Sequence, residues 1–231
     1  MNGYMRKAFE LAKCPVALTG AGVSAPSGIP TFQSTWKERP VRDFLSRAYR
    51  NQDPIGFFEL FCEMVSWCEA VPNEAHRALA SMDMPVITQN IDGLHQRAGS
   101  KKIVELHGNL RTVFCVKCGR QQSAAGFCEK LRPLYTKNGN NEISADEIQK
   151  CLTCGCGGRF DTEIVLYGDQ VQGLDEAFAL LDDCDLLLVI GTSLETYPAA
   201  VMPQYAKRRG ARVLIENQDC VFALTGKRGL S

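Results

Sequence analysis

Short apolar runs alternate with helical patterns along most of this 231-residue chain, and this alternation is what most limits the fold. Val, Ile and Leu dominate the runs, so the predicted strands are apolar on both faces, as buried parallel strands are. Parallel strands need crossover connections, which the helical patterns supply. The sequence therefore predicts an α/β, Rossmann-like, doubly wound parallel sheet with its ligand site at the carboxyl ends of the strands. The predicted strands cover residues 15–19, 85–88, 103–106, 164–166, 186–190 and 212–215, and the predicted helices cover residues 2–13, 54–70, 73–82, 93–98, 174–183 and 198–209.

The stretch at residues 115–161 breaks this alternation, because it is polar and rich in Lys, Asn, Gly and Cys. We interpret it as a small inserted module with one modest helix near residues 125–135. The proline-containing residues 24–50 predict a long loop followed by a short helix. The expected division is a Rossmann-type domain at residues 1–35, 84–114 and 162–231, a loop with a helical segment at 36–83, and the cysteine-rich module at 115–161.

Cysteine is unusually frequent, with 11 residues, and the odd count argues against complete disulfide pairing. Cys115 with Cys118 and Cys151 with Cys154 both have the spacing C-x-x-C-G, a knuckle in which two thiolates share one metal ion. Cys156 is an alternative fourth ligand. Four thiolates close the coordination shell, so we expect one structural zinc ion.

Composition excludes several classes of protein. Lys and Arg together number 26, as do Asp and Glu, so the formal net charge is zero and a dedicated nucleic-acid binder is disfavoured. No apolar run approaches the ~18 residues of a membrane span, and the first residues lack the pattern of a signal peptide. We expect a cytoplasmic protein without membrane or direct nucleic-acid partners, and favour a monomer.

Glycine and small polar residues follow two predicted strands. Gly20, Ala21, Gly22 and Ser24 come after the first strand, where they indicate either a nucleotide site or an ordinary tight turn. Gly191, Thr192 and Ser193 come after the fifth strand, where they could bind a ribose or phosphate or cap a helix. Glu216 and Asn217 end the sixth strand, a common place for ribose contacts in α/β folds.

Amide, carboxylate and imidazole groups follow the second and third predicted strands. Gln89, Asn90 and Asp92 stand after one strand and His107 after the next. Imidazole is the side chain best suited to move a proton near neutral pH, and His107, between a strand and a glycine, is our candidate base. Of the other histidines, His76 is expected to pack or cap a helix, and His95 is undecided.

Together these motifs resemble the sirtuins, the NAD-dependent protein lysine deacylases. The resemblance runs in order from about residue 16 to residue 217. It rests on Gly20-Ala21-Gly22-Val23-Ser24, Ser27-Gly28-Ile29-Pro30, Thr88-Gln89-Asn90-Ile91-Asp92, His107-Gly108, the paired cysteines, Gly191-Thr192-Ser193 with Pro198-Ala199-Ala200, and Asn217.

The resemblance implies that NAD and an acyl-lysine protein or peptide bind together, and that the acyl group passes to ADP-ribose while nicotinamide leaves. It implies that His107 is the general base, that Asn90 and Asp92 position the nicotinamide, ribose and water, and that residues 165–168 pair with the substrate peptide as an added strand. The residues it assigns to NAD binding are Gly20, Ala21, Gly22, Ser24, Phe32, Gln33, Gln89, Asn90, Ile91, Asp92, Gly191, Thr192, Ser193 and Asn217.

The chain also departs from the family pattern. Thr31 and Gln33 flank Phe32 where most members have Asp and Arg, so a charged contact to the cofactor is replaced. The helix at residues 54–70 lacks the Tyr-x-x-Arg pair with which some members clamp acidic acyl groups, and Glu63 would repel such groups. We therefore expect a neutral acyl group, acetyl or a longer aliphatic chain.

Two alternatives stay open on sequence alone. One is an NAD glycohydrolase or mono-ADP-ribosyltransferase, which would deliver ADP-ribose to water or to a side chain. The other is a weakly catalytic NAD or ADP-ribose sensor, which the replacement at Gln33 suggests. Asn90, Asp92 and His107 argue against a sensor, because a protein that only binds has no evident need for a base.

Overall fold

The computed structural model describes residues 3–31, 34–136 and 145–216. The chain forms two compact units, the first from Met1–Thr31, Ala70–His107 and Val171–Ser231, and the second from Phe32–Glu69 and Gly108–Gln170. This division differs from the expected one. Residues 70–83 belong with the sheet, and residues 36–69 share a unit with the cysteine-rich module. Residues 34–35, 108–114 and 162–170, expected in the Rossmann-type domain, also belong to the second unit.

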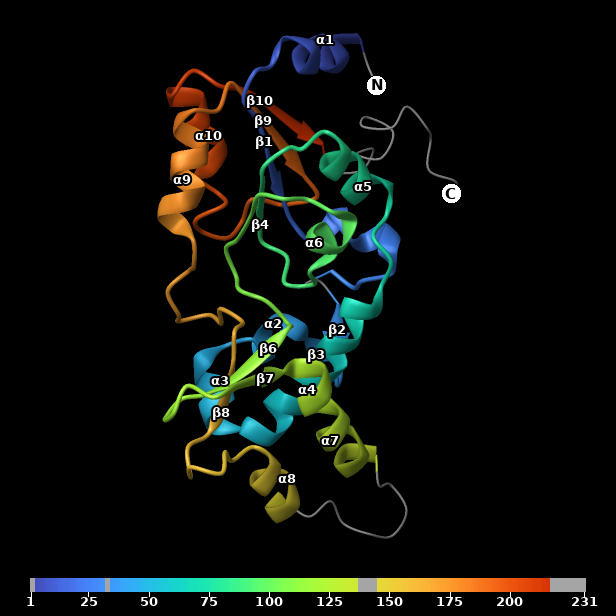
Figure 1. The fold of residues 1–231 in the computed structure, drawn as a ribbon, viewed down its shortest axis with the longest axis vertical. Coiled ribbons are helices and arrows are strands. Elements are labelled where there is room, and N and C mark those ends of the chain that lie inside the picture. Colours follow the sequence, from blue (N-terminus) through green and yellow to red (C-terminus); the bar gives the residue numbers. More distant parts are fainter. Residues whose placement is uncertain (1–2, 32–33, 137–144, 217–231) are drawn as a thin grey trace. The chain divides into compact units, whose positions relative to one another are not determined.

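The first unit contains the predicted parallel sheet (Figure 1), with strand order β10-β9-β1-β4-β5. From β1 the chain first adds β4 and β5 on one side, and later adds β9 and β10 on the other. Such a reversal leaves a crevice at the carboxyl ends of the two strands that flank it, here β1 and β9. The strands are β1 (Pro15–Thr19), β4 (Val86–Thr88), β5 (Ile103–Glu105), β9 (Leu186–Ile190) and β10 (Arg212–Glu216).

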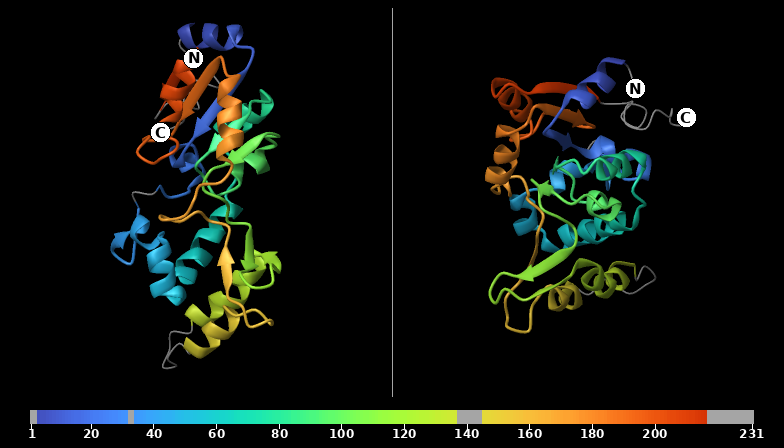
Figure 2. Two further views of the ribbon diagram at one scale, coloured as in Figure 1. Left: turned by 90° about the vertical axis from the view of Figure 1, so that its left-hand side faces the viewer. Right: turned by 45° about the horizontal axis from the view of Figure 1, so that its top comes forward.

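Helices cover both faces of this sheet because alternate strand residues point to opposite faces. Val16 and Leu18 of β1 face a core completed by α9 (Leu174–Asp182) and α10 (Met202–Arg208), which lie side by side in Figures 1 and 2. Ala17 faces the opposite core, formed with α5 (Glu74–Ser81) and Phe9 of α1 (Gly3–Leu11). The predicted helices at residues 2–13, 73–82, 174–183 and 198–209 are confirmed with shorter ends.

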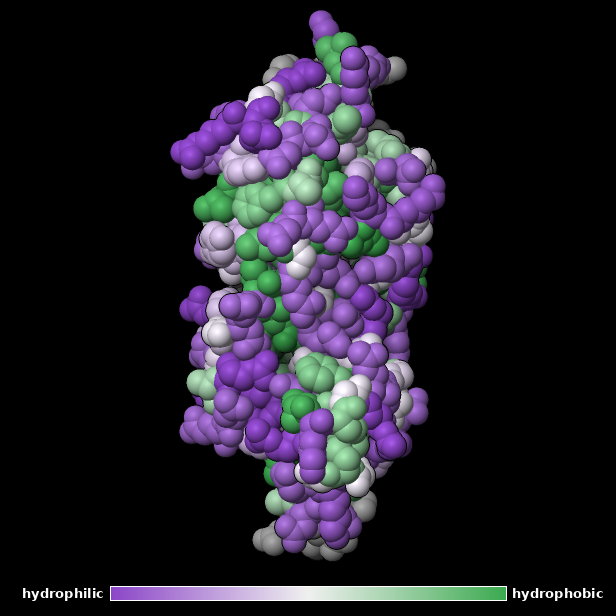
Figure 3. All heavy atoms as spheres, turned by 60° about the vertical axis from the view of Figure 1, so that its left-hand side comes forward, coloured by the Kyte–Doolittle hydropathy of each residue, from purple (hydrophilic) through white to green (hydrophobic). Residues whose placement is uncertain are grey.

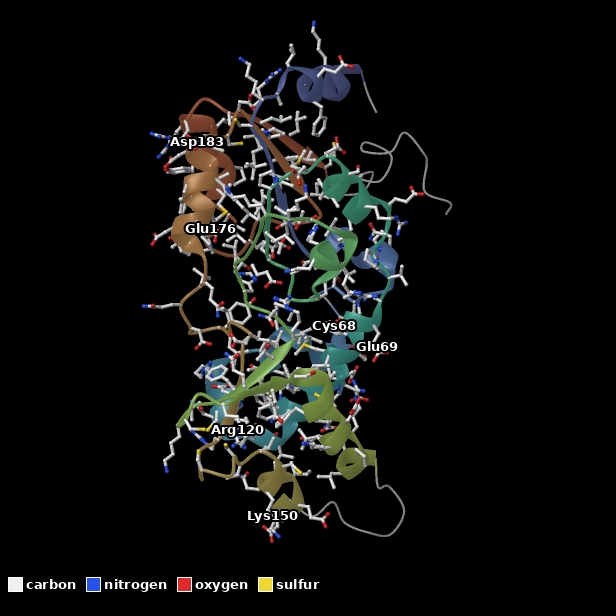
Figure 4. The ribbon with its side chains drawn as sticks, in the orientation of Figure 1. Cys68, Glu69, Arg120, Lys150, Glu176 and Asp183 are labelled. Carbon is white, nitrogen blue, oxygen red and sulfur yellow. The ribbon has the colours of Figure 1, made fainter. Side chains whose placement is uncertain are left out.

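The outer faces of these helices are polar. Glu176 and Asp183, labelled in Figure 4, are both exposed, at the start and just after the end of α9. On the face drawn in Figure 3, hydrophilic residues predominate and hydrophobic ones form narrow patches. Within residues 3–31, 34–136 and 145–216, no helix is long and apolar enough to cross a membrane.

The second unit has an aromatic core between a small antiparallel sheet and several helices. Phe58 packs against Phe61 and Phe127, and Phe127 against Phe160, with ring centroids 5.3 to 5.7 Å apart. The sheet consists of β6 (Thr112–Cys115), β7 (Gln121–Ser123) and β8 (Phe160–Thr162) in the order β7-β6-β8. Its other elements are β2 (Thr35–Trp36), β3 (Arg39–Pro40), α2 (Val41–Phe44), α3 (Arg47–Gln52), α4 (Pro54–Val65), α7 (Ala124–Thr136) and α8 (Ala145–Cys151).

One predicted strand is wrong. Residues 164–166 are apolar, and Ile164 and Leu166 are buried, but they form a loop after β8. The next residue, Tyr167, pairs outside the main sheet, where its N–H donates to the Leu45 carbonyl and its carbonyl accepts from the Arg47 N–H. A short apolar run is buried equally well in a loop, so burial did not identify a strand here.

Candidate active site and metal centre

The glycines after β1 allow this segment to approach the end of β9 very closely. The Gly20 N–H donates to the Ile190 carbonyl at 3.0 Å, and the Gly22 N–H donates to the Gly191 carbonyl at 2.8 Å. A Cβ atom on Gly20 would lie 2.7 Å from the Thr192 Cβ, and one on Gly22 would lie 2.8 Å from the Gly191 Cα. Side chains at either position would fill the space where the two strand ends meet.

After β1 the chain forms short 3-10 turns at Ala21–Val23 and Ala25–Ser27. A helix of several turns would present unpaired N–H groups and an aligned dipole to an anion, whereas a single 3-10 turn has little dipole. The close approach to β9, rather than a helix N-terminus, therefore explains the two glycines.

Ser24 lies at the centre of a buried polar cluster that joins the ends of β1 and β4. Its side chain is fully buried, and its Oγ lies 2.9 Å from the Asn90 Nδ2 and 2.7 Å from the Asp92 Oδ2. The other carboxylate oxygen of Asp92 accepts from the Leu94 N–H at 2.9 Å. The structure thus brings Ser24, from the end of one predicted strand, together with Asn90 and Asp92, from the end of another.

The Asp92 carboxyl is subject to opposing effects. Burial raises its pKa above the ordinary value, while hydrogen bonds from the Leu94 N–H and the Ser24 hydroxyl oppose that rise. Because donors hold both oxygens, the geometry favours the carboxylate form that can accept hydrogen bonds.

Gln89 connects the end of β4 to the end of β9. Its Nε2 donates to the Thr192 Oγ1 at 2.7 Å, and the same hydroxyl oxygen accepts from the Leu194 N–H at 3.1 Å. Ile91, in the following turn, is buried, whereas Ser193 is exposed. Two of the predicted polar strand ends are therefore linked directly.

His107 follows β5 and has a defined orientation. Its Nδ1 lies 3.1 Å from the carbonyl oxygen of Gln89. A carbonyl oxygen can only accept, so Nδ1 carries the hydrogen and the neutral ring has its lone pair on Nε2. Burial lowers the pKa of His107 below the ordinary 6.5, which keeps the ring neutral at pH 7. His107 can therefore accept a proton at Nε2.

Some predicted positions lie outside the described residues, namely Phe32, Gln33 and Asn217. Sequence reasoning also missed part of the cluster. Thr19 and Thr88 form a buried hydroxyl pair at 2.8 Å, and His76 and His95 contact the cluster from two helices. The signal available for Thr19 and Thr88 was a polar residue ending each of two adjacent buried strands.

Four cysteines of the second unit form a cluster that could hold a metal ion. The sulfur atoms of Cys115, Cys118, Cys154 and Cys156 all lie within 4.8 Å of one another, with Cys115 and Cys156 at 3.5 Å and Cys118 and Cys154 at 3.8 Å. Tetrahedral zinc with Zn–S bonds of about 2.3 Å places its sulfurs roughly 3.8 Å apart. This geometry fits zinc and uses all four coordination positions.

Backbone hydrogen bonds shape the first knuckle. The Cys115 N–H donates to the carbonyl of Arg120, a residue labelled in Figure 4, and the Gly119 N–H donates to the Cys115 carbonyl. Backbone N–H groups of Cys118 and Lys117 also bond the Cys115 sulfur, and they lower its pKa to about 6. The thiolate form required for metal binding is therefore favoured.

The structure corrects the second predicted knuckle. Cys151 is the last residue of α8 and is absent from the cluster, and both Cys154 and Cys156 belong to it. After α8 the chain turns tightly, because the Cys154 N–H donates to the Gly158 carbonyl and the Gly157 N–H to the Cys154 carbonyl. This turn brings both sulfurs to the same site, so the second ligand pair is C-x-C.

The predicted peptide-binding segment at residues 165–168 is partly paired within its own unit. Besides the backbone bonds of Tyr167, the Arg47 guanidinium bonds both oxygens of Asp169, at 2.9 and 2.7 Å, and also Asp161 at 2.7 Å. These contacts hold the segment against α3. Peptide pairing by this segment stays a prediction, and Tyr167 is not free to provide its backbone on this side.

A comparison with protein families matches residues 20–198 to the family model described as "Sir2 family". Among curated relatives, the NAD-dependent protein deacetylase of Saccharolobus solfataricus is 37% identical over 227 residues, which cover 94% of this chain and 86% of the relative. NAD-dependent protein deacylase 2 of Archaeoglobus fulgidus is 36% identical, covering 96% of this chain and 88% of the relative.

Solved structures also resemble this chain. A structure described as "Sir2-p53 peptide-NAD+" has a TM-score of 0.80 and 32% identity, covering 94% of this chain and 86% of that one. Another, described as Sir2Tm bound to a propionylated peptide, has a TM-score of 0.78 and 32% identity, with coverage of 94% and 86%.

Proposed function

The chain belongs to the Sir2 family, and from this premise we propose that it is an NAD-dependent protein lysine deacylase. In the proposed reaction a neutral acyl group passes from a lysine side chain to ADP-ribose, and nicotinamide is released. Relatives carry the names deacetylase and deacylase, and similar solved structures hold NAD or an acylated peptide.

The observation that carries this proposal is the orientation of His107. Its Nδ1–H is bound to the Gln89 carbonyl, so a lone pair remains on Nε2 in a ring that burial keeps neutral. Asn90 and Asp92 follow the same strand as Gln89 and are joined through Ser24. A pure binding site has no need of an oriented base beside such a cluster.

The ends of β1 and β9 fit a dinucleotide. The absence of side chains at Gly20 and Gly22 leaves backbone at the switch point of the sheet, where α/β folds bind such ligands. Gly20, Ala21, Gly22 and Ser24 would hold the phosphate and ribose portion. The rest of NAD would be held by Gly191, Thr192, Ser193 and Asn217, together with Gln89. The proposed NAD-binding residues also include Phe32, Gln33 and Ile91.

When bound, NAD supplies an activated ribose carbon from which nicotinamide can depart. The residues of this chain then have separable tasks. His107 accepts a proton at Nε2. The Asp92 carboxylate and the Asn90 amide, both held by Ser24, orient the ligand.

A zinc ion is the second cofactor, and the cluster of Cys115, Cys118, Cys154 and Cys156 would hold it. A shell closed by four thiolates has no position for water or substrate, so the ion stabilises the second unit and takes no part in the reaction. The proposal includes a cytoplasmic location, since thiolate ligands require reduced cysteines, and it includes a monomeric enzyme.

The test is mass spectrometry of the products formed from NAD and an acetyl-lysine peptide. We expect O-acetyl-ADP-ribose, nicotinamide and deacetylated peptide from the wild-type protein. His107→Ala should reduce turnover at least 100-fold through loss of the base, and the exposed control Glu176→Ala should leave it unchanged. A succinyl-lysine peptide should react poorly, because α4 has no cation for its carboxylate and Glu63 is bonded to the Trp36 indole N–H.

Other products would contradict the proposal. Nicotinamide and plain ADP-ribose with unchanged peptide would indicate NAD hydrolysis, and modified protein would indicate ADP-ribosyl transfer. NAD binding without any product would indicate a sensor. Full activity of His107→Ala would reject the assigned base.

A further inference from the structure

Two of the three histidines have no role in the proposed reaction, although they contact its residues. His76 on α5 is 0% exposed and His95 on α6 (Leu94–Ala98) is 1% exposed, and their ring centroids lie 4.7 Å apart. Burying two imidazoles beside each other is unfavourable unless their hydrogen bonds compensate.

Backbone geometry fixes the tautomer of His76. Its Nδ1 lies 3.4 Å from the backbone nitrogen of Asn73, whose N–H can only donate, so Nδ1 is an acceptor. The hydrogen of the neutral ring is therefore on Nε2, which lies 3.3 Å from the Ser24 Oγ. Burial, with a smaller effect of the adjacent Arg77, lowers the pKa of His76 to about 4, so the neutral form is the relevant one.

This tautomer determines the direction of the Ser24 hydroxyl. The Ser24 oxygen accepts from the His76 Nε2–H and from the Asn90 Nδ2, which occupies both of its lone pairs. Its own hydrogen then points to the Asp92 Oδ2 at 2.7 Å. His76 thus holds Asp92 in place through one intervening hydroxyl.

His95 supports the same cluster by a second chain of hydrogen bonds. Its Nε2 lies 3.0 Å from the Thr19 Oγ1, the Thr19 hydroxyl donates to the Thr88 Oγ1, and that oxygen accepts the Asn90 backbone N–H at 3.0 Å. The His95 Nδ1 is buried and has no hydrogen-bond partner among the described residues. A hydrogen there would be an unpaired buried donor, so Nε2–H is again the favoured tautomer.

Charged and titratable groups face the pair from several sides. Asp92 faces His76 through Ser24, Arg77 is next to His76 on α5 and lowers the pKa of His76, and His76 lowers the pKa of His95. Burial lowers the pKa of His95 to about 3, with a further contribution from His76. Both rings therefore stay neutral around pH 7.

We propose that His76 and His95 are positioning residues, locked as Nε2–H tautomers, whose two hydrogen-bond chains fix the Asp92 side chain and the Asn90 backbone. Neither ring contacts the reacting atoms. The functional part of this inference rests on the proposed deacylase activity, but the tautomers do not depend on it.

The first test is long-range nitrogen-15 NMR of the folded protein labelled at histidine. With only three histidines, we expect two Nε2–H signals, from His76 and His95, and one Nδ1–H signal, from His107. Assignment by His76→Gln and His95→Gln identifies each ring, and neither of the two should titrate between pH 5.5 and 8. An Nδ1–H or protonated state in either ring would overturn the inference, whether or not the protein is a deacylase.

The second test separates positioning from stability. In His76→Gln the amide nitrogen can take the place of Nε2–H, whereas His76→Leu has no donor. We expect His76→Leu to lower kcat/KM for NAD about tenfold with KM for the acyl peptide changed less than twofold, and His76→Gln to recover most of the loss. Equal kcat/KM in folded His76→Leu and wild-type protein would overturn the inference.

Where His76→Leu does not fold, the other chain supplies the test. Thr19→Val keeps the shape of the side chain and removes the hydroxyl, and Thr19→Ser keeps the hydroxyl. We expect a similar loss of kcat/KM for NAD in Thr19→Val alone. If both variants match the wild type, the positioning role is rejected, and if the wild type itself does not deacylate, only the proposed function fails.

Discussion

At the scale of single residues, burial affects all three histidines of this protein, but they differ in the ring nitrogen that carries the hydrogen. Burial lowers the pKa of His76, His95 and His107 alike. The hydrogen-bond partner of each ring then determines which nitrogen carries the hydrogen, and so whether the ring can accept a proton at Nε2. The Gln89 carbonyl selects Nδ1–H in His107 and leaves Nε2 basic, whereas the Asn73 N–H selects Nε2–H in His76.

These buried histidines also predict how stability depends on pH. Their folded pKa values are about 4 for His76 and about 3 for His95, against 6.5 for the ordinary side chain. Between pH 6.5 and 4 the unfolded chain takes up protons that the folded protein does not, so the free energy of unfolding falls on acidification. The limiting slope is about 1.4 kcal/mol per pH unit for each histidine.

Urea unfolding at pH 7 and at pH 5 measures this slope. His76→Gln should show a shallower dependence, because the unfolded variant has one fewer histidine to protonate. Equal unfolding free energies of the wild type at the two pH values would contradict the prediction.

At the scale of elements, the contact between the ends of β1 and β9 is the feature on which the proposed nucleotide site depends. The strand register places Thr19 beside Ile190. The residues that follow the two strands lie so close together that a Cβ atom on Gly20 or Gly22 would clash with residue 191 or 192. The polar residues after β4 join the same region through the bond between Gln89 and Thr192.

Gly22→Ala should disturb this contact. The new Cβ would lie 2.8 Å from the Gly191 Cα, and backbone on both sides limits relaxation, so we expect a loss of about 1–3 kcal/mol in unfolding free energy. The NAD affinity should fall as well.

Gly126→Ala in α7 is the matched control, because no atom lies within 4 Å of its Cβ position. Alanine within a helix is favoured over glycine, so stability should be unchanged or higher by up to about 1 kcal/mol. Urea unfolding and calorimetric NAD titration measure both variants. A Gly22→Ala protein as stable as Gly126→Ala would show that the strand ends are not as tightly packed as the structure has them.

At the scale of the whole molecule, the two units are stabilised differently. The first has continuous apolar cores on both faces of its sheet. The second combines an aromatic core with a cluster of four cysteines. Metal binding contributes directly to folding in such modules, so the second unit should depend on zinc.

Cys156→Ser and Cys151→Ser test this dependence together with the corrected ligand set. Cys156→Ser should lower the zinc content and the Tm, because one of four thiolates is lost. Cys151→Ser should retain one zinc ion per chain and a Tm near that of the wild type. Metal analysis measures the zinc content of both variants, and thermal unfolding measures their Tm. Loss of zinc in Cys151→Ser with retention in Cys156→Ser would show that Cys151 and Cys154, rather than Cys154 and Cys156, are the second ligand pair.

The sequence by itself determined the sheet strands other than the one at residues 164–166, most helices and the family. These follow from patterns that are local: apolar runs, helical periodicity, and motifs of adjacent residues such as Asn90 to Asp92. It also predicted the existence of a four-thiolate cluster, because cysteines at knuckle spacing are typical zinc ligands.

Only the tertiary structure decided which cysteines converge, which unit includes residues 70–83, and how the histidines are oriented. Each of these depends on where a helix ends or on a partner far away in the chain. Cys151 is excluded from the cluster because α8 extends to it. His76 acts on Asp92 through Ser24, which lies 52 residues before His76 in the chain. Sequence spacing has no information about such contacts, because hydrogen-bond direction and side-chain proximity are set only when the strand ends meet.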